Sequence, residues 1–159
     1  MLHFAYGSNL SRKLMRRHAP AAEPAGVARL AGYRFVITRD GYASVEPSIG
    51  GEVHGVLWRL TPRDRVTLDV WENVSAGLYR PVMLPVEIGG QRKSALVYLG
   101  RPGKEGRAKP GYMEVVISAV QEWQIPEAYI QSLQQWLPSG AKGNLSVFKG
   151  PSHKIGDFG

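Results

Sequence analysis

The chain of 159 residues is long enough for one domain with a sizeable core, and its composition, 43% hydrophobic and 21% charged, is neither disordered nor membrane-like. It contains no cysteine, which excludes disulfide bonds, thiolate metal sites, iron–sulfur clusters and a cysteine nucleophile. Twenty Lys and Arg against 13 Asp and Glu give a net charge of +7, compatible with an anionic partner: a nucleic acid, a membrane surface or an acidic small molecule.

The first part of the chain predicts strands and one short helix. Residues 2–6 form a short apolar run that ends at a glycine, which is typical of a buried strand. Asn9 or Ser11 can cap a helix that runs to Arg17 and stops before Pro20. Three β-rich segments follow, the first two joined by a hairpin turn at 39–41: residues 33–38, 42–46 and 52–60.

A second helix is predicted directly after these strands. Thr61 suits its N-cap, Pro62 its first helical position and Asp64 the positive end of its dipole. Four residues are expected to form its apolar side: Val66, Leu68, Val70 and Trp71.

The rest of the chain predicts a hairpin followed by two helices. Strands at residues 80–88 and 95–99 flank a turn at Gly89-Gly90. Helices are expected at residues 112–123 and 126–137, the second with a stripe of Ile130, Leu133 and Leu137. The sum is an α+β fold, a single domain over residues 1–137 with a curved, barrel-like mixed β-sheet and a few flanking helices. A C-terminal tail of unknown role follows at residues 138–159.

Sequence signals for export, membrane insertion and cofactors are lacking. Basic residues follow the N-terminal apolar run, which is the reverse of a secretory signal. No stretch approaches the roughly 20 apolar residues that span a bilayer, so we expect a cytoplasmic protein with no membrane partner. Glycine-rich nucleotide motifs are missing, and we expect no metal or cofactor because ligand spacing is absent among His3, His18, His54 and His153.

The segment Phe4-Ala5-Tyr6-Gly7-Ser8-Asn9-Leu10 is the first that could carry chemistry. Gly7 allows the backbone to approach a ligand closely, and the free N–H groups at a helix start favour an anion. The same residues are also consistent with a capped turn that binds nothing, which is a common arrangement. Ser8 is a weak candidate nucleophile because its context is not G-x-S-x-G.

Two carboxylates lie at the predicted end of the second helix. Asp69 and Glu72 are three residues apart, so both can share one helix face. A carboxylate beside Trp71 would have its pKa raised by loss of hydration, which suits a base that works near pH 7. Since most glutamates are exposed, a solvated acid at the helix end remains an open interpretation.

Tyrosines and basic clusters complete the set of candidates. Four tyrosines can each offer a rigid wall and a hydroxyl in a cleft, or simply pack in the core: Tyr6, Tyr79, Tyr98 and Tyr112. Basic residues gather at 12–17 and 101–109, without interleaved aromatics or a nucleic-acid motif. A solvated basic surface is therefore the simpler interpretation, and no nucleic-acid partner is expected.

Taken in this order, the segments resemble the γ-glutamylcyclotransferase-like superfamily. Its N-terminal hallmark, F-x-Y-G-S-N-[LM], reads Phe4 to Leu10 here. A second hallmark, a D-x-x-E-G-like segment followed by a segment that begins with Tyr, reads Asp69-Val70-Trp71-Glu72-Asn73 and Tyr79-Arg80-Pro81-Val82. The resemblance extends from Met1 to about Leu137. It departs at Asn73, where the family has Gly, but Asn tolerates the left-handed conformation that Gly often supplies.

The resemblance implies a cyclisation of a γ-glutamyl amine or peptide to 5-oxoproline and a free amine, without cofactor or metal. It implies that Glu72 is the catalytic acid/base and that the substrate's α-carboxylate binds backbone amides of the N-terminal turn. The implied substrate-binding residues are Tyr6, Gly7, Ser8, Asn9, Leu10, Tyr79, Tyr98 and Tyr112. A non-catalytic small-molecule-binding module on the same fold is the alternative, and charge-driven nucleic-acid binding is a third interpretation.

Overall fold

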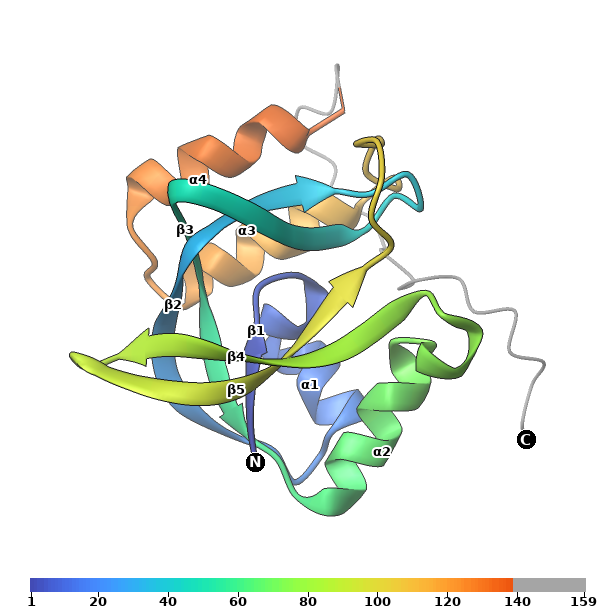
Figure 1. Ribbon diagram of the computed structural model, residues 1–159, viewed down its shortest axis with the longest axis vertical. Helices are drawn as coiled ribbons and strands as arrows, with labels where there is room; N and C mark the ends of the chain where they lie inside the picture. Colours follow the sequence, from blue (N-terminus) through green and yellow to red (C-terminus); the bar gives the residue numbers. More distant parts are fainter. Residues whose placement is uncertain (139–159) are drawn as a thin grey trace.

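Five strands close into a barrel in the order β1-β3-β2-β4-β5, as the computed structural model shows for residues 1–138, the part of the chain that it describes (Figure 1). Neighbouring strands are antiparallel, except that β1 and β5 are parallel where His3 pairs with Leu96. The strands are β1 (Leu2–Ala5), β2 (Glu23–Ile37), β3 (Ala43–Arg59), β4 (Tyr79–Ile88) and β5 (Gln91–Gly100). The predicted tail, apart from its first residue, lies outside the described residues.

Helices and short 3₁₀ turns flank this barrel, and the predicted α+β fold is confirmed (Figure 1). The helices are α1 (Arg12–His18), α2 (Pro62–Trp71), α3 (Tyr112–Glu122) and α4 (Glu127–Leu133). The 3₁₀ turns are η1 (Ser8–Leu10), η2 (Val74–Ala76) and η3 (Gln134–Trp136). The last predicted helix, at residues 126–137, is therefore α4 continued by η3.

Strands β2 and β3 are longer than the sequence patterns predict. The sequence patterns predict no strand at residues 23–32 and two separate strands in place of β3. Prolines and glycines such as Pro24 and Gly26 interrupt the β pattern of the sequence. The register shifts at these two residues and again between Ala31 and Tyr33, so bulges absorb the irregularity and the ladder continues.

Helix starts follow the predicted capping chemistry. Of the two candidate caps for α1, Ser11 is used, and its hydroxyl accepts a hydrogen bond from the Leu14 N–H at 3.3 Å. Helix α2 begins with Thr61 at the N-cap and Pro62 inside the first turn, as predicted. These caps fix where α1 and α2 begin beside the barrel.

The predicted apolar side of α2 is wrong at two positions. Val66 and Val70 are 63% and 59% exposed, whereas Leu68 is fully buried. The buried face is set by Asp64 and Leu68, which are one helical turn apart, while the two valines share the opposite face. A buried aspartate on the inner face is the feature that the apolar pattern could not reveal.

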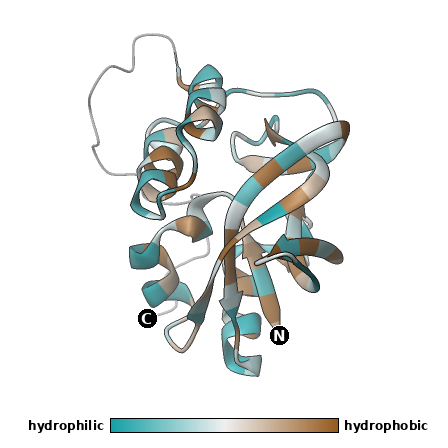
Figure 2. Cartoon of the chain, turned by 90° about the vertical axis from the view of Figure 1, so that its left-hand side faces the viewer, coloured by the Kyte–Doolittle hydropathy of each residue, from teal (hydrophilic) through white to brown (hydrophobic). Residues whose placement is uncertain are grey.

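The core fills the barrel and the spaces between barrel and helices. Hydrophobic and hydrophilic residues alternate along the strands in Figure 2, as expected for a sheet with one buried face. The largest fully buried apolar side chains include Phe4, Leu10, Met15, Leu30, Ile37 and Leu57. Within residues 1–138, no helix has the length and apolar character needed to cross a bilayer.

Candidate active site

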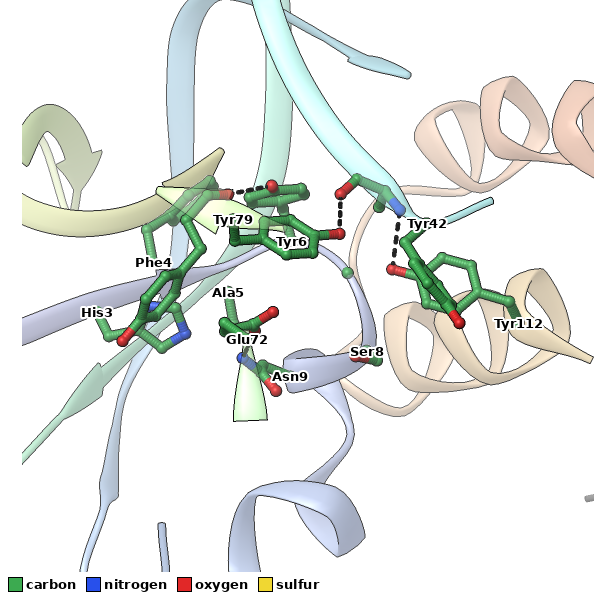
Figure 3. A pocket seen from close by; sticks show the side chains of 13 residues that line it. His3, Phe4, Ala5, Tyr6, Ser8, Asn9, Tyr42, Glu72, Tyr79 and Tyr112 are labelled. Atoms are coloured by element: carbon green, nitrogen blue, oxygen red, sulfur yellow. Dashed lines mark hydrogen bonds between the residues drawn. The ribbon is translucent and has the colours of Figure 1, made fainter. Parts of the chain in front are cut away.

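A cavity lies beside β1, at the point where that strand leads into η1 (Figure 3). It contains about 370 Å³ of empty space, part of which is open to solvent. Its lining residues come from distant parts of the chain: His3, Phe4, Ala5, Tyr6, Gly7, Ser8, Asn9, Tyr42, Ala43, Glu72, Tyr79, Tyr98 and Tyr112. All residues of the predicted site except Leu10 are therefore brought together.

Leu10 does not line the cavity, contrary to the expectation that it binds substrate. Its side chain is fully buried in the core. Its N–H donates to the carbonyl of Gly7 at 3.0 Å, and its own carbonyl accepts from Nε1 of Trp123 at 2.8 Å. Leu10 thus holds the turn in place, and its backbone N–H is already satisfied within η1.

Gly7 is required at its position by a close approach of side chains. A Cβ atom there would lie 2.7 Å from the hydroxyl oxygen of Tyr112 and 3.2 Å from Cβ of Ala43. Real Cβ atoms do not tolerate a contact as short as the first, so any larger residue would push Tyr112 away. The glycine expected to admit a ligand therefore also admits the tyrosine that forms one wall of the cavity.

Glu72 follows the last residue of α2 and is only 7% exposed. Its Oε1 atom accepts a hydrogen bond from Nδ2 of Asn9 at 2.8 Å. Burial raises the pKa of Glu72 to about 8, an effect that the Asn9 hydrogen bond opposes and the nearby charge of Asp69 reinforces. The solvated helix-end acid is therefore excluded, and Glu72 can exchange a proton near neutral pH.

Asn73 turns the chain at the end of α2. Its backbone is in the left-handed conformation, with φ at 52°. The substitution of Asn for the glycine of the family pattern therefore keeps the turn that follows Glu72. Trp71, on the other side of Glu72 in the sequence, stacks on His18 with ring centroids 3.6 Å apart.

Two tyrosines hold the backbone of Ala43 at the edge of the cavity. The Tyr79 hydroxyl donates to the Ala43 carbonyl at 2.5 Å, and the Tyr112 hydroxyl accepts from the Ala43 N–H at 3.1 Å (Figure 3). Burial raises the pKa of both phenols well above the ordinary value, so both are neutral. Their hydroxyls therefore act as fixed dipoles that shape the cavity.

The other two tyrosines of the predicted set, Tyr6 and Tyr98, form hydrogen bonds with β5 and with α2. The Tyr6 hydroxyl donates to the carbonyl of Tyr98. The Tyr98 hydroxyl donates to Oδ1 of Asp69 at 2.6 Å, and the same oxygen accepts from Nε of Arg65 at 2.9 Å. Asp69 is thus paired outside the cavity lining, while Glu72, three residues later, faces the cavity.

Several cavity residues, notably His3 and Tyr42, are not predicted by the sequence motifs. His3 and Ala5 alternate along β1 and both line the cavity, so the period of the strand could have linked His3 to the following turn. Tyr42 follows the predicted hairpin turn, but only the closed barrel places that turn beside the cavity. Within residues 1–138, no group of three or more His, Asp and Glu side chains could hold a metal ion.

Comparison with known proteins gives a family for this chain. The model of the AIG2-like family matches residues 52–133, which include α2, Glu72, Tyr79, Tyr98 and Tyr112. The chain belongs to the AIG2-like family.

This AIG2-like chain is similar to proteins that are named γ-glutamylcyclotransferases. It is 29% identical to the mouse protein of that name over 156 residues, which span 91% of this chain and 83% of the relative. It is 27% identical to the human protein over 158 residues, with the same shares. A solved structure named γ-glutamyl cyclotransferase has a TM-score of 0.82 and 26% identity, covering 92% of this chain and 93% of that one. The resemblance noted in the sequence is therefore confirmed.

Proposed function

We propose that this protein is a γ-glutamylcyclotransferase that converts a γ-glutamyl amine or peptide into 5-oxoproline and a free amine. The observation that carries the proposal is the buried Glu72 beside Asn9, in a cavity that also includes the Gly7–Asn9 turn. The names of the relatives support the reaction class, since they align with more than nine-tenths of this chain.

In this proposal the substrate's α-carboxylate binds near the backbone N–H groups of the turn. The N–H groups of Leu10 and Ser11 donate to carbonyls of the turn itself, so the carboxylate is assigned to the residues before them, Gly7 to Asn9. One small carboxylate held by backbone dipoles does not require an arginine or lysine. The net charge of +7 is then a property of the surface rather than of the site.

Glu72 is proposed to move the protons of the cyclisation. Its carboxylate takes a proton from the α-ammonium, and the freed amine forms a bond to the carbon of the substrate's own γ-carbonyl group. The resulting tetrahedral carbon expels the leaving nitrogen, which receives a proton from Glu72 as the amide C–N bond breaks. The ring nitrogen loses a second proton as it becomes an amide nitrogen, and this proton departs with the released amine. The nucleophile is part of the substrate, so the enzyme mainly folds the substrate and transfers protons.

A direct test measures 5-oxoproline by mass spectrometry after incubation with a panel of γ-glutamyl amines and dipeptides. The wild-type protein should release 5-oxoproline from at least one of them. Glu72→Gln should lower kcat by about 10³-fold, because positioned acid–base groups contribute rate factors of this order. Glu52→Gln is the matched control and should retain full activity, because Glu52 is an exposed carboxylate on β3 that pairs with Arg29 on β2.

Two outcomes would contradict the proposal. Turnover by folded Glu72→Gln at the wild-type rate would remove Glu72 as the acid/base. Binding of γ-glutamyl compounds without any release of 5-oxoproline would favour the alternative, a small-molecule-binding module on the same fold.

A further inference from the structure

His3 lines the cavity but has no part in the proposed proton transfers of Glu72. It lies on β1 and is only 2% exposed. Figure 3 shows its imidazole on the side of the cavity where Glu72 and Asn9 lie. A buried polar ring in a cavity wall calls for a hydrogen-bond partner at each nitrogen.

One nitrogen of His3 is satisfied by the barrel. Nδ1 lies 3.1 Å from the carbonyl oxygen of Leu96, on the strand that closes the barrel against β1. A carbonyl oxygen only accepts hydrogen bonds, so Nδ1 must carry a proton. Burial lowers the pKa of His3 to about 4, and the ring is therefore neutral.

The other nitrogen is an acceptor without a protein donor. In a neutral imidazole that is protonated on Nδ1, Nε2 carries only a lone pair. This atom is buried and has no hydrogen-bond partner among residues 1–138. Leaving a buried acceptor unpaired costs free energy, which a ligand donor in the cavity would recover.

The chemistry of a γ-glutamyl compound narrows the choice of donor. Its α-carboxylate and γ-carbonyl are acceptors and would face the Nε2 lone pair unfavourably. Its α-ammonium has three N–H donors, of which the proposed reaction directs one to Glu72. Because His3 lies on the same side of the cavity as Glu72, a second N–H of the ammonium is the donor that fits.

We propose that Nε2 of His3 accepts a hydrogen bond from the α-ammonium of the substrate, which makes His3 a further substrate-binding residue beside Glu72. This assignment rests on the proposed function. His3 adds a second acceptor that orients the amine, so that the lone pair freed when Glu72 takes a proton points at the carbon of the γ-carbonyl group.

Two substitutions test the roles of the two His3 nitrogens separately. In His3→Asn, the shorter amide reaches the position of Nδ1 and can still donate to the Leu96 carbonyl, but nothing replaces Nε2. In His3→Gln, the longer side chain reaches the position of Nε2 and can present an acceptor oxygen there. His54→Asn is the matched control, because His54 lies on β3, bonds to Glu52 and is not part of the cavity.

Binding is measured by calorimetry with two unreactive ligands. L-Methionine sulfone has the α-carboxylate, the α-ammonium and a sulfone oxygen in place of the γ-carbonyl, and it has no leaving amine. 4-(Methylsulfonyl)butanoate is the same molecule without the ammonium. His3→Asn should weaken binding of methionine sulfone about 10-fold, in line with loss of a hydrogen bond to a charged group, and change binding of the butanoate less than twofold. His3→Gln should recover part of the loss, and His54→Asn should bind both ligands like the wild type.

A measurement on the wild-type protein does not depend on the folding of a variant. The ¹⁵N resonance of the unprotonated His3 Nε2 should shift when methionine sulfone is added and stay in place with the butanoate. An unchanged resonance with both ligands, or equal weakening of both ligands in His3→Asn, would overturn the assignment.

The two proposals fail in different ways. A wild-type protein that releases 5-oxoproline while His3→Asn keeps the wild-type KM and kcat overturns only the role of His3. A wild-type protein that binds methionine sulfone through His3 but releases no 5-oxoproline overturns only the proposed reaction.

Discussion

A buried carboxylate lies at each end of α2, and the two carboxylates differ in the number of hydrogen-bond donors around them. Asp64, in the first turn, is 1% exposed and accepts hydrogen bonds from the N–H groups of Thr61 and Ala21 and from the Thr61 hydroxyl. Glu72, just after the last turn, is 7% exposed and accepts from Asn9. Burial is thus similar, while the supply of donors differs.

This difference shows why a buried carboxylate alone does not identify a reactive site. The donors around Asp64 close a capping box that stabilises the start of the helix. Glu72 faces a cavity, and burial raises its pKa to about 8. We infer that the N-terminal end of α2 serves stability and the C-terminal end serves chemistry, and four predictions test this division.

The largest of these four effects is expected from narrowing the cavity at Gly7. In Gly7→Ala, the new methyl group would lie 2.7 Å from the Tyr112 hydroxyl, so Tyr112 must move. Displacement of a cavity wall by about 1 Å should lower kcat/KM about 100-fold. The double variant Gly7→Ala/Tyr112→Phe removes the oxygen in closest contact and should regain part of the lost thermal stability, as measured by melting curves. If Gly7→Ala alone keeps full activity, the close approach is unimportant for function.

The next effect is expected at the other end of the helix, on stability alone. Asp64→Ala removes the capping box and leaves the Ala21 and Thr61 N–H groups without their acceptor. The free energy of unfolding in urea should fall by about 2 kcal/mol, while kcat stays within about twofold of wild type. Arg63→Ala, at an exposed position of the same turn, is the control and should leave both quantities unchanged. A large loss of kcat in folded Asp64→Ala would contradict the inference that the N-terminal end of α2 serves stability alone.

Glu72→Gln should raise the free energy of unfolding, whereas Asp64→Ala should lower it. Because the folded-state pKa of Glu72 lies above its value in an unfolded chain, the folded protein binds more protons between about pH 4.5 and 8. The contribution of Glu72 to stability is therefore complete at low pH and is lost as pH rises through the folded pKa near 8. Gln has no such loss, so the variant should be more stable than wild type by about 1–2 kcal/mol at pH 8.5 and by less at pH 5. Urea unfolding at the two pH values measures the difference, and a difference that is the same at both would argue against a raised pKa.

The smallest effect is expected at the turn after Glu72. The backbone of Asn73 is in the left-handed conformation, which Gly adopts readily and Ala does not. Asn73→Gly should therefore change the free energy of unfolding by less than about 0.5 kcal/mol, whereas Asn73→Ala should lower it by about 1 kcal/mol. Thermal or urea unfolding of the pair measures this. Equal stabilities of the Gly and Ala variants would show that the backbone conformation of this residue matters little.

Features of the fold and the site could be predicted from the sequence where they depend on residues close together in the chain. Local chemistry predicted the Thr61 cap, the hairpins and the start of α2, since these depend on residues within one or two turns. The motifs around Gly7 and Glu72, through their resemblance to a family, predicted eight of the thirteen residues that line the cavity. Leu10 does not line the cavity, and the motif does not reveal that its N–H is satisfied within η1.

Features that depend on contacts between residues distant in the sequence were missed. Val66 and Val70 looked like a core face because the sequence does not show that Asp64 is buried against Ala21. His3 looked uninformative because its role depends on Leu96, which is distant in the sequence and adjacent only when β5 closes the barrel.

The same closure has a consequence for how the protein folds. The His3–Leu96 hydrogen bond joins residues 93 apart, and the Asn9–Glu72 bond joins residues 63 apart. Contacts this distant in sequence form slowly, because a long loop must close before they can contribute. A chain emerging from the ribosome can therefore make α1 and α2 early. It acquires the complete cavity only after β5 and the start of α3 have been synthesised and the barrel has closed.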